Sequence, residues 1–151
     1  MQAINISTGL KEIEIVRDGE KAGIIRFDPS DPALLNRLLA LRETTKDIHA
    51  EPTEDVEKIL DESARIDAEL RAALDKAFDY PVSDIVFGNS ACFTTSNGVS
   101  LLEQFLDGVA PIIRDALEAE GKAEEARKKR INKYTAKYQK PDTPDTTEGD
   151  E

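Results

Sequence analysis

Residues 53–81 have the sequence TEDVEKILDESARIDAELRAALDKAFDYP, which contains the clearest helix signal in the chain. Apolar side chains recur at helical spacing here, with charged side chains on the opposite face, as in an amphipathic helix. Thr53 is suited to be the N-cap, and Glu54 and Asp55 are favourable in the first turn. Pro81 should end the helix. The apolar face consists of Val56, Ile59, Leu60, Ile66, Leu70, Leu74 and Phe78.

A second amphipathic helix is predicted immediately upstream. Asp31 can act as its N-cap, and Pro32 suits the first helical position because its missing N–H costs nothing there. The helix should end near Ala50, before Pro52. Two such helices joined by a short turn are expected to pack as an antiparallel pair. The upstream stripe contains Leu34, Leu38, Leu41 and Ile48, widened by Leu35 and Leu39.

Residues 3–27 predict a small β-meander. Isoleucine or phenylalanine alternates with other residues in three short runs, a period of two that places each pair on one face of a strand. Thr8-Gly9 and Asp18-Gly19 separate the runs and suit tight hairpin turns. A sheet of two or three such short strands must be covered by helices. The alternating pairs are Ile4 and Ile6, Ile13 and Ile15, and Ile25 and Phe27.

Downstream of Pro81 the local signals are weaker. Residues 82–98 fit either a second hairpin or an irregular buried turn. Ser100 and Glu103 then have capping-box spacing ahead of an apolar stripe, which predicts a helix over residues 98–120. Gly108 and Pro111 should kink it. The expected fold class is α+β and predominantly helical, with the N-terminal β-meander packed against an antiparallel helical bundle.

Charge divides the chain into three blocks. Residues 1–120 hold 24 acidic and 12 basic side chains and are expected to form one globular domain. Residues 121–140 hold eight basic and two acidic side chains and predict a helical arm, whereas residues 141–151 hold five acidic and no basic ones and predict a disordered tail. The balance of −12 in residues 1–120, within a net charge of −11 for the whole chain, disfavours nucleic-acid or membrane binding through the domain itself.

The sequence offers little for catalysis. His49 is the only histidine and ends a predicted helix, where its charge is favourable without any catalytic role. Cys92 is the only cysteine and lies in an apolar run that predicts a buried thiol. Ligand spacing for zinc or calcium and a phosphate-binding loop are not found. We therefore expect a non-enzyme without cofactor or metal. The lone cysteine, together with no secretion signal and no membrane-spanning run, predicts a cytoplasmic protein.

The basic arm is the strongest local anomaly, because it combines positive charge with two tyrosines one helical turn apart. This surface could bind an acidic partner or, as a less favoured alternative, nucleic acid. The acidic tail would compete with phosphates. The apolar stripe of the preceding helix is the other candidate contact surface, although such a stripe is more often core. The predicted partner-binding residues are Phe105, Val109, Ile112, Ile113, Arg127, Lys128, Arg130, Tyr134 and Tyr138.

Four short motifs carry a resemblance to a known group of proteins: residues 4–9 (INISTG), 27–32 (FDPSDP), 86–88 (VFG) and 134–138 (YTAKY). In this order they resemble a family of short proteins from phages and prophages of Gram-positive bacteria. Members lie near tail genes and are likened to tail assembly chaperones. The resemblance spans most of residues 4–138.

The resemblance implies a cytoplasmic assembly factor of the bacterial host cell. Tail assembly chaperones bind the long tape-measure protein and keep it soluble until tail-tube subunits assemble around it. We accordingly expect binding of a tape-measure-like helical protein, with homo-oligomers also possible and no membrane contact. Two alternatives stay open, namely a structural component of the tail or virion and a nucleic-acid-binding accessory protein that uses the basic arm.

Overall fold

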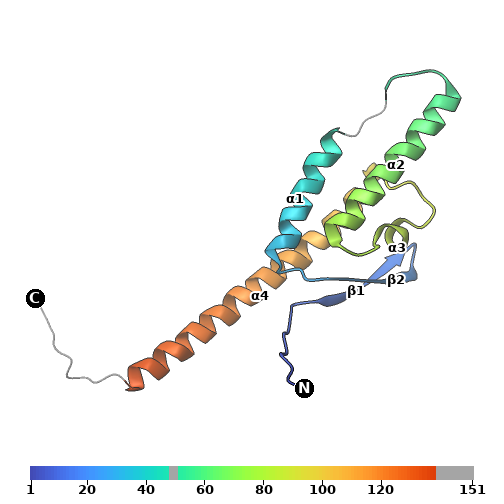
Figure 1. Ribbon diagram of the computed structural model, residues 1–151. Helices are drawn as coiled ribbons and strands as arrows, with labels where there is room; N and C mark the ends of the chain where they lie inside the picture. Colours follow the sequence, from blue (N-terminus) through green and yellow to red (C-terminus); the bar gives the residue numbers. More distant parts are fainter. Residues whose placement is uncertain (48–50, 139–151) are drawn as a thin grey trace, which may run out of the picture. The chain divides into compact units, whose positions relative to one another are not determined.

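The computed structural model of the protein describes residues 1–47 and 51–138 (Figure 1). The fold is α+β and predominantly helical, which confirms the predicted class. The chain divides into two compact units, Met1–Ala116 and Leu117–Glu151. In chain order the elements are β1 Lys11–Arg17, β2 Glu20–Phe27, α1 Pro32–Asp47, α2 Val56–Phe78, α3 Ser83–Phe87, β3 Thr95–Ser96, β4 Val99–Ser100 and α4 Leu101–Tyr138.

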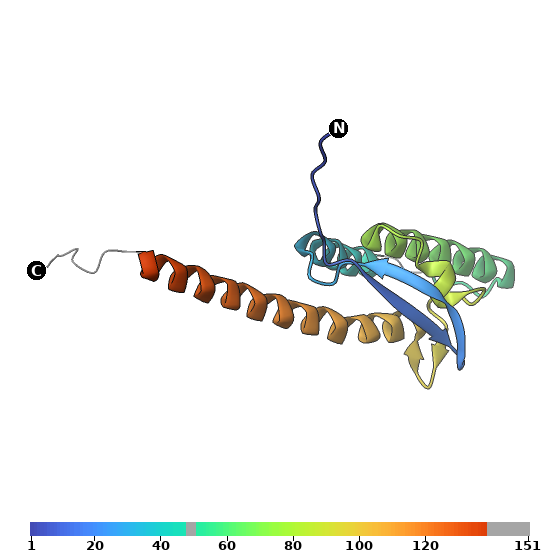
Figure 2. The ribbon, with the colours of Figure 1, turned by 90° about the horizontal axis from the view of Figure 1, so that it is seen from below.

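The N-terminal sheet is a two-stranded hairpin rather than a three-stranded meander. β1 pairs antiparallel with β2, and Ile13 lies opposite Ile25. The turn is made by Asp18 and Gly19, whose φ angles of 53° and 81° match the type I′ turn expected of this dipeptide. The prediction of a strand at Ile4 and Ile6 is wrong. Residues 1–10 lie outside both strands, and the N-terminal segment extends away from the hairpin (Figure 2).

The helix pair α1–α2 runs antiparallel, as expected (Figure 1). Asp31 caps α1, since its Oδ1 accepts a hydrogen bond from the N–H of Ala33 at 2.9 Å. The N-cap of α2 is Asp55, whose carboxylate accepts from the N–H of Glu57 at 3.0 Å. The prediction of Thr53 as N-cap is therefore wrong, because its hydroxyl accepts from the N–H of Asp55 instead. The predicted end of α1 near Ala50 lies outside the described residues.

Residues 82–100 contain a short helix that the sequence pattern did not predict. α3 is fixed from a distance: the carboxylate of Asp75 accepts hydrogen bonds from the N–H of Ser83 at 2.7 Å and from its hydroxyl at 2.8 Å. Gly88 ends α3 with φ 58°, a backbone conformation that favours glycine, and the guanidinium of Arg17 lies close to it. The β3–β4 hairpin follows at residues 95–100.

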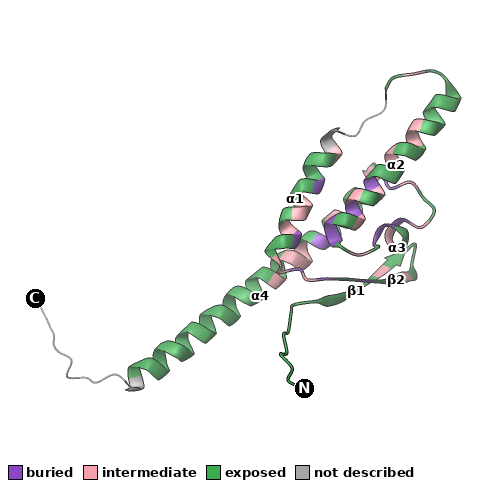
Figure 3. Cartoon of the chain, viewed as in Figure 1, coloured by how far each residue is buried: buried purple, intermediate pink, exposed green. Residues whose placement is uncertain are grey.

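One hydrophobic core joins these elements in the first unit (Figure 3). At its centre the ring of Phe78 contacts those of Phe27 and Phe105, with ring centroids 5.2 and 5.4 Å apart. The hairpin, α2 and the start of α4 are thus held by aromatic contacts. The buried apolar side chains are Ile25, Phe27, Leu34, Leu41, Leu70, Leu74, Ala77, Phe78, Val82, Phe87, Cys92, Phe105 and Val109.

Helix α4 continues without a break from the core into the basic sequence. The hydroxyl of Ser100 accepts from the N–H of Glu103 at 3.1 Å, which confirms the predicted cap. Pro111 lies inside the helix and does not end it. The kink predicted at Gly108 and Pro111 stays a prediction. In the described part of the chain, no helix has the combination of length and apolar character needed to cross a membrane.

Candidate binding groove

An open groove of about 510 Å³ lies within the first unit, between the N-terminal hairpin and the start of α4. This volume is within the ~300–1,000 Å³ range of common ligand sites. One side is formed by residues 13–18 of β1 and its turn, and the other by α4 and residues 94–96. The groove-lining residues are Ile13, Glu14, Ile15, Val16, Arg17, Asp18, Ile25, Val86, Ser90, Thr94, Thr95, Ser96, Leu101, Gln104, Phe105, Gly108, Val109 and Ile112.

The groove reaches the edge of β1. Successive side chains of a strand point to opposite faces, and the consecutive residues 13–17 of β1 all line the groove, while Ile25 of β2 lines it from the sheet face. β1 has β2 as its only strand neighbour among the described residues. Its outer edge therefore presents backbone N–H and C=O groups without a strand partner. Such an edge is a template for an added strand.

Helix α4 supplies the apolar wall. Leu101, Phe105 and Val109 are spaced four residues apart and share one helix face, and Ile112 continues it. The first turn of α4 is fixed by the preceding segment, because the N–H of Leu101 donates to the carbonyl of Thr94 at 2.8 Å. Gly108 also lines the groove, and apart from its chain neighbours and the backbone of its own helix no atom lies within 4 Å of where its Cβ would be. The absence of a side chain there keeps the groove open.

The predicted apolar stripe is divided between core and groove. Phe105 and Val109 are buried, and Ile112 and Ile113 are partly buried against the core. These side chains pack in the chain's own core, so the stripe does not face outward along its whole length, and its role in partner binding stays a prediction. Three of the four still border the groove with one part of their surface, whereas Ile113 does not line it. The sequence did not predict that β1 forms the other side of the groove, because only the fold brings β1 next to α4.

Arg71 holds residues 88–92 in place, a role that the sequence did not predict. Its guanidinium donates to Asp67 at 3.0 Å, to the carbonyl of Gly88 at 2.8 Å and to the carbonyl of Ser90 at 2.6 Å. It also lies 5.6 Å from the ring centroid of Phe87. The other carboxylate oxygen of Asp67 accepts from the N–H of Cys92 at 2.8 Å. The pair Arg71–Asp67 therefore fixes residues 88–92, which lead into the groove wall.

Arg17 fixes the hairpin to α3 from the groove side. Its Nη1 donates to the carbonyl of Ile85 at 2.9 Å and to that of Val86 at 3.3 Å. These are carbonyls in the last turn of a helix, which are left without helical partners and favour a cation. The edge of β1 is thereby held in place by a charged side chain, and the rim of the groove also carries Glu14 and Asp18.

Cys92 is fully buried, as its apolar run predicted. Burial, reinforced by the nearby carboxylate of Asp67, raises the pKa of its thiol to about 12. A thiol with this pKa is protonated at neutral pH and is a poor nucleophile. His49 lies outside the described residues. Within the described ranges, 1–47 and 51–138, His, Cys, Asp and Glu side chains form no group that could hold a metal ion.

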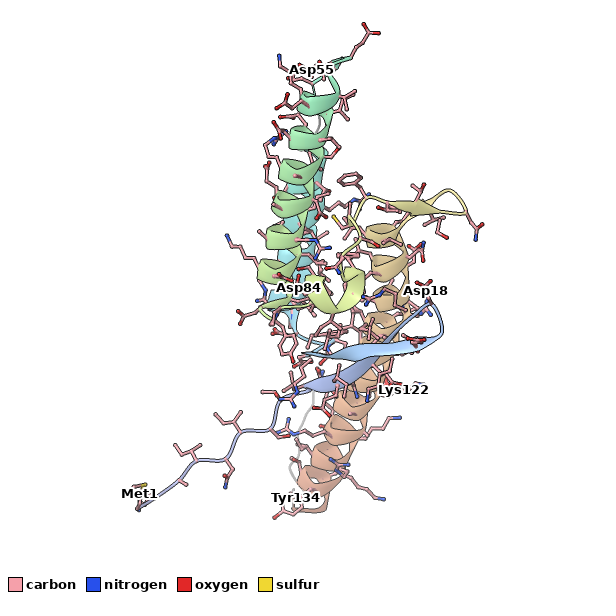
Figure 4. The ribbon with its side chains drawn as sticks, turned by 90° about the vertical axis from the view of Figure 1, so that its right-hand side faces the viewer. Met1, Asp18, Asp55, Asp84, Lys122 and Tyr134 are labelled. Carbon is pink, nitrogen blue, oxygen red and sulfur yellow. The ribbon has the colours of Figure 1, made fainter. Side chains whose placement is uncertain are left out.

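The basic arm belongs to the second unit. Arg127, Lys128, Arg130 and Tyr134 are all exposed along α4, and Lys128 lies 3.6 Å from Glu124 as an exposed ion pair. Figure 4 labels Tyr134 in this part of the helix. The side chain of Tyr138 and the predicted acidic tail, residues 141–151, are outside the described part. The arm is therefore an exposed helical surface, and the partner it was predicted to bind stays a prediction.

Comparisons with known protein families, curated protein sequences and solved structures found no match for this chain. Function is therefore inferred from the chemistry of the groove and from the sequence resemblance. The groove combines unpaired backbone groups along β1 with an apolar wall on α4. That combination suits the binding of a polypeptide segment, because hydrogen bonds satisfy its backbone while the wall buries its apolar side chains.

Proposed function

We propose that this protein is a non-enzymatic binding protein whose groove holds an apolar segment of a partner protein. The observation that carries the proposal is the free edge of β1 beside the apolar face of α4. A partner segment gains backbone hydrogen bonds along the edge and buries apolar area against Phe105, Val109 and Ile112. Both contributions favour binding without requiring a reactive group.

The partner is proposed to be a tape-measure-like helical protein, one apolar segment of which pairs with the β1 edge in an extended conformation, because a helical segment has no free backbone groups for such pairing. This makes the chain a phage tail assembly chaperone or a related tail-morphogenesis factor. The resemblance of residues 4–138 supports this identity. A chaperone for a long amphipathic protein needs an apolar surface to cover the partner's apolar positions and a charged exterior to keep the complex from associating further. The groove supplies the apolar surface, and the exposed, charged faces of α2 and α4 supply the charged exterior.

Co-expression with overlapping fragments of a tape-measure protein tests the proposal. We expect at least one fragment to be soluble with this protein, to co-purify with it, and to precipitate when expressed alone. An unrelated acidic protein of similar size is the control, because it adds negative charge without a groove. If every fragment that covers the tape-measure protein stays insoluble or fails to co-purify, the proposed function is wrong.

A further inference from the structure

The first eight residues form an extended, uncharged arm that no element of the described chain covers. Ile4 and Ile6 are 90% and 83% exposed, and the side chains of residues 1–8 carry no charge. The two isoleucines are two residues apart, so in an extended conformation they point to the same face. Figure 4 shows this segment, which ends at Met1, extending away from the rest of the first unit. We call residues 1–8 the N-terminal arm.

The arm matches the groove in chemistry and in length. β1 has seven residues with an unpaired outer edge, so seven or eight residues of an extended chain can pair along it. In that pairing Ile4 and Ile6 would both face one side, where α4 presents Phe105 and Val109. A two-stranded hairpin is also marginal in water, and a third strand would stabilise it.

The arm is directed away from the free edge of its own β1. The N–H of Gly9 donates to Oδ2 of Asp28 at 3.2 Å, and Asp28 directly follows β2. A Cβ on Gly9 would lie 2.7 Å from Oδ1 of the same side chain, so the backbone here is packed closely against Asp28. The residues before Gly9 run past the end of β2 and so leave the sheet. A turn back along the outer edge of the same β1 would break this contact.

We propose that, without its partner, this protein forms a dimer in which the N-terminal arm of each copy adds as a strand to the β1 edge of the other. The exchange is reciprocal, so both arms and both grooves are used and the assembly closes at two copies. The inference uses the groove invoked in the proposed function, but it concerns the partner-free protein. In this arrangement the dimer protects the groove until a partner segment replaces the arm.

The oligomeric state of the full chain is the first test. Sedimentation velocity over a range of concentrations should show a dimer for the native chain. The double variant I4D/I6D should be a monomer, with a dimer dissociation constant raised about a hundredfold or more, because two apolar side chains no longer bury. The control V56D/L60D changes two residues of α2 that are 67% and 64% exposed, and should remain a dimer.

A labelled peptide with the sequence of residues 1–10 provides the second test. It should bind the full-chain I4D/I6D protein in a fluorescence-polarisation titration, whereas the same peptide with both isoleucines replaced by aspartate should not. A monomeric native chain, a dimer that I4D/I6D leaves intact, or absence of peptide binding overturns the inference. If a tape-measure fragment still binds in any of these cases, the proposed function survives and only the arm exchange fails.

Discussion

Replacing Arg71 with alanine is expected to lower the free energy of unfolding by about 3 kcal/mol. The cause is that removing one member of a largely buried charge pair leaves the polar groups it bonded to buried without that partner. The side chain is only 16% exposed and its guanidinium satisfies Asp67 and the carbonyls of Gly88 and Ser90. Alanine would remove the donor to both carbonyls and to one oxygen of Asp67, whose other oxygen keeps its bond to Cys92, and would also uncover the ring of Phe87. The bond to Asp84 contributes little, because that carboxylate is 91% exposed.

Urea unfolding followed by circular dichroism measures the effect, with Arg65→Ala as the matched control. Arg65 is also on α2 and pairs with two carboxylates, Glu62 and Glu69, but these pairs are at the surface. We expect the Arg65 variant to unfold at nearly the same urea concentration as the native chain. Similar midpoints for the two variants would contradict the role assigned to Arg71.

Cys92 is expected to be almost inert toward alkylation in the native protein. Burial raises the pKa of its thiol from 9.0 to about 12, so the thiolate population at pH 8 is lower by a factor of about 1,000. Iodoacetamide at pH 8 should therefore modify the native chain at least about 1,000 times more slowly than the urea-unfolded chain, as mass spectrometry can follow. Comparable rates in the two states would show that the thiol is accessible.

The raised pKa of the Cys92 thiol also predicts how the stability of the native protein depends on pH. The folded-state pKa of Cys92 lies above the unfolded value, so the native state holds this proton more tightly. The resulting stabilisation is complete below pH 9 and is lost as the pH rises from 9 to 12. Between pH 8 and pH 10.5 the native chain should lose about 2 kcal/mol more than Cys92→Ala, a variant without this titration. Equal losses in both proteins would exclude the effect.

Local sequence patterns were sufficient to predict the main helices and one hairpin. Asp31 before Pro32, Asp18 before Gly19, and Ser100 before Glu103 each act within a few residues, so their patterns predicted the right caps and turn. The strand expected at Ile4 and Ile6 failed for a tertiary reason. Alternation predicts a strand only where an edge is available, and Gly9 leads the chain away from its own edge.

The missed features depend on contacts between distant residues. α3 has only five residues, and its start is held by Asp75 from α2. Arg71 and Asp67 have the spacing of an ordinary surface pair on a helix, and only the chain at residues 88–92 makes them a buried cluster. Likewise the apolar positions of α4 were visible in the sequence, but the groove exists because the fold places β1 beside them.

Gly108 offers the most direct test of the groove as the functional site. Its replacement by leucine fills open space in the groove and favours the helix by roughly 0.8 kcal/mol, so lost binding would not reflect unfolding. Gly121→Leu is the matched control, because Gly121 is also in α4 with open space around it but does not line the groove. The measurement is the affinity of a tape-measure fragment for the native chain and for each variant. We expect Gly108→Leu to weaken binding at least about tenfold and Gly121→Leu to bind like the native chain, whereas equal affinity for all three proteins would contradict binding in the groove.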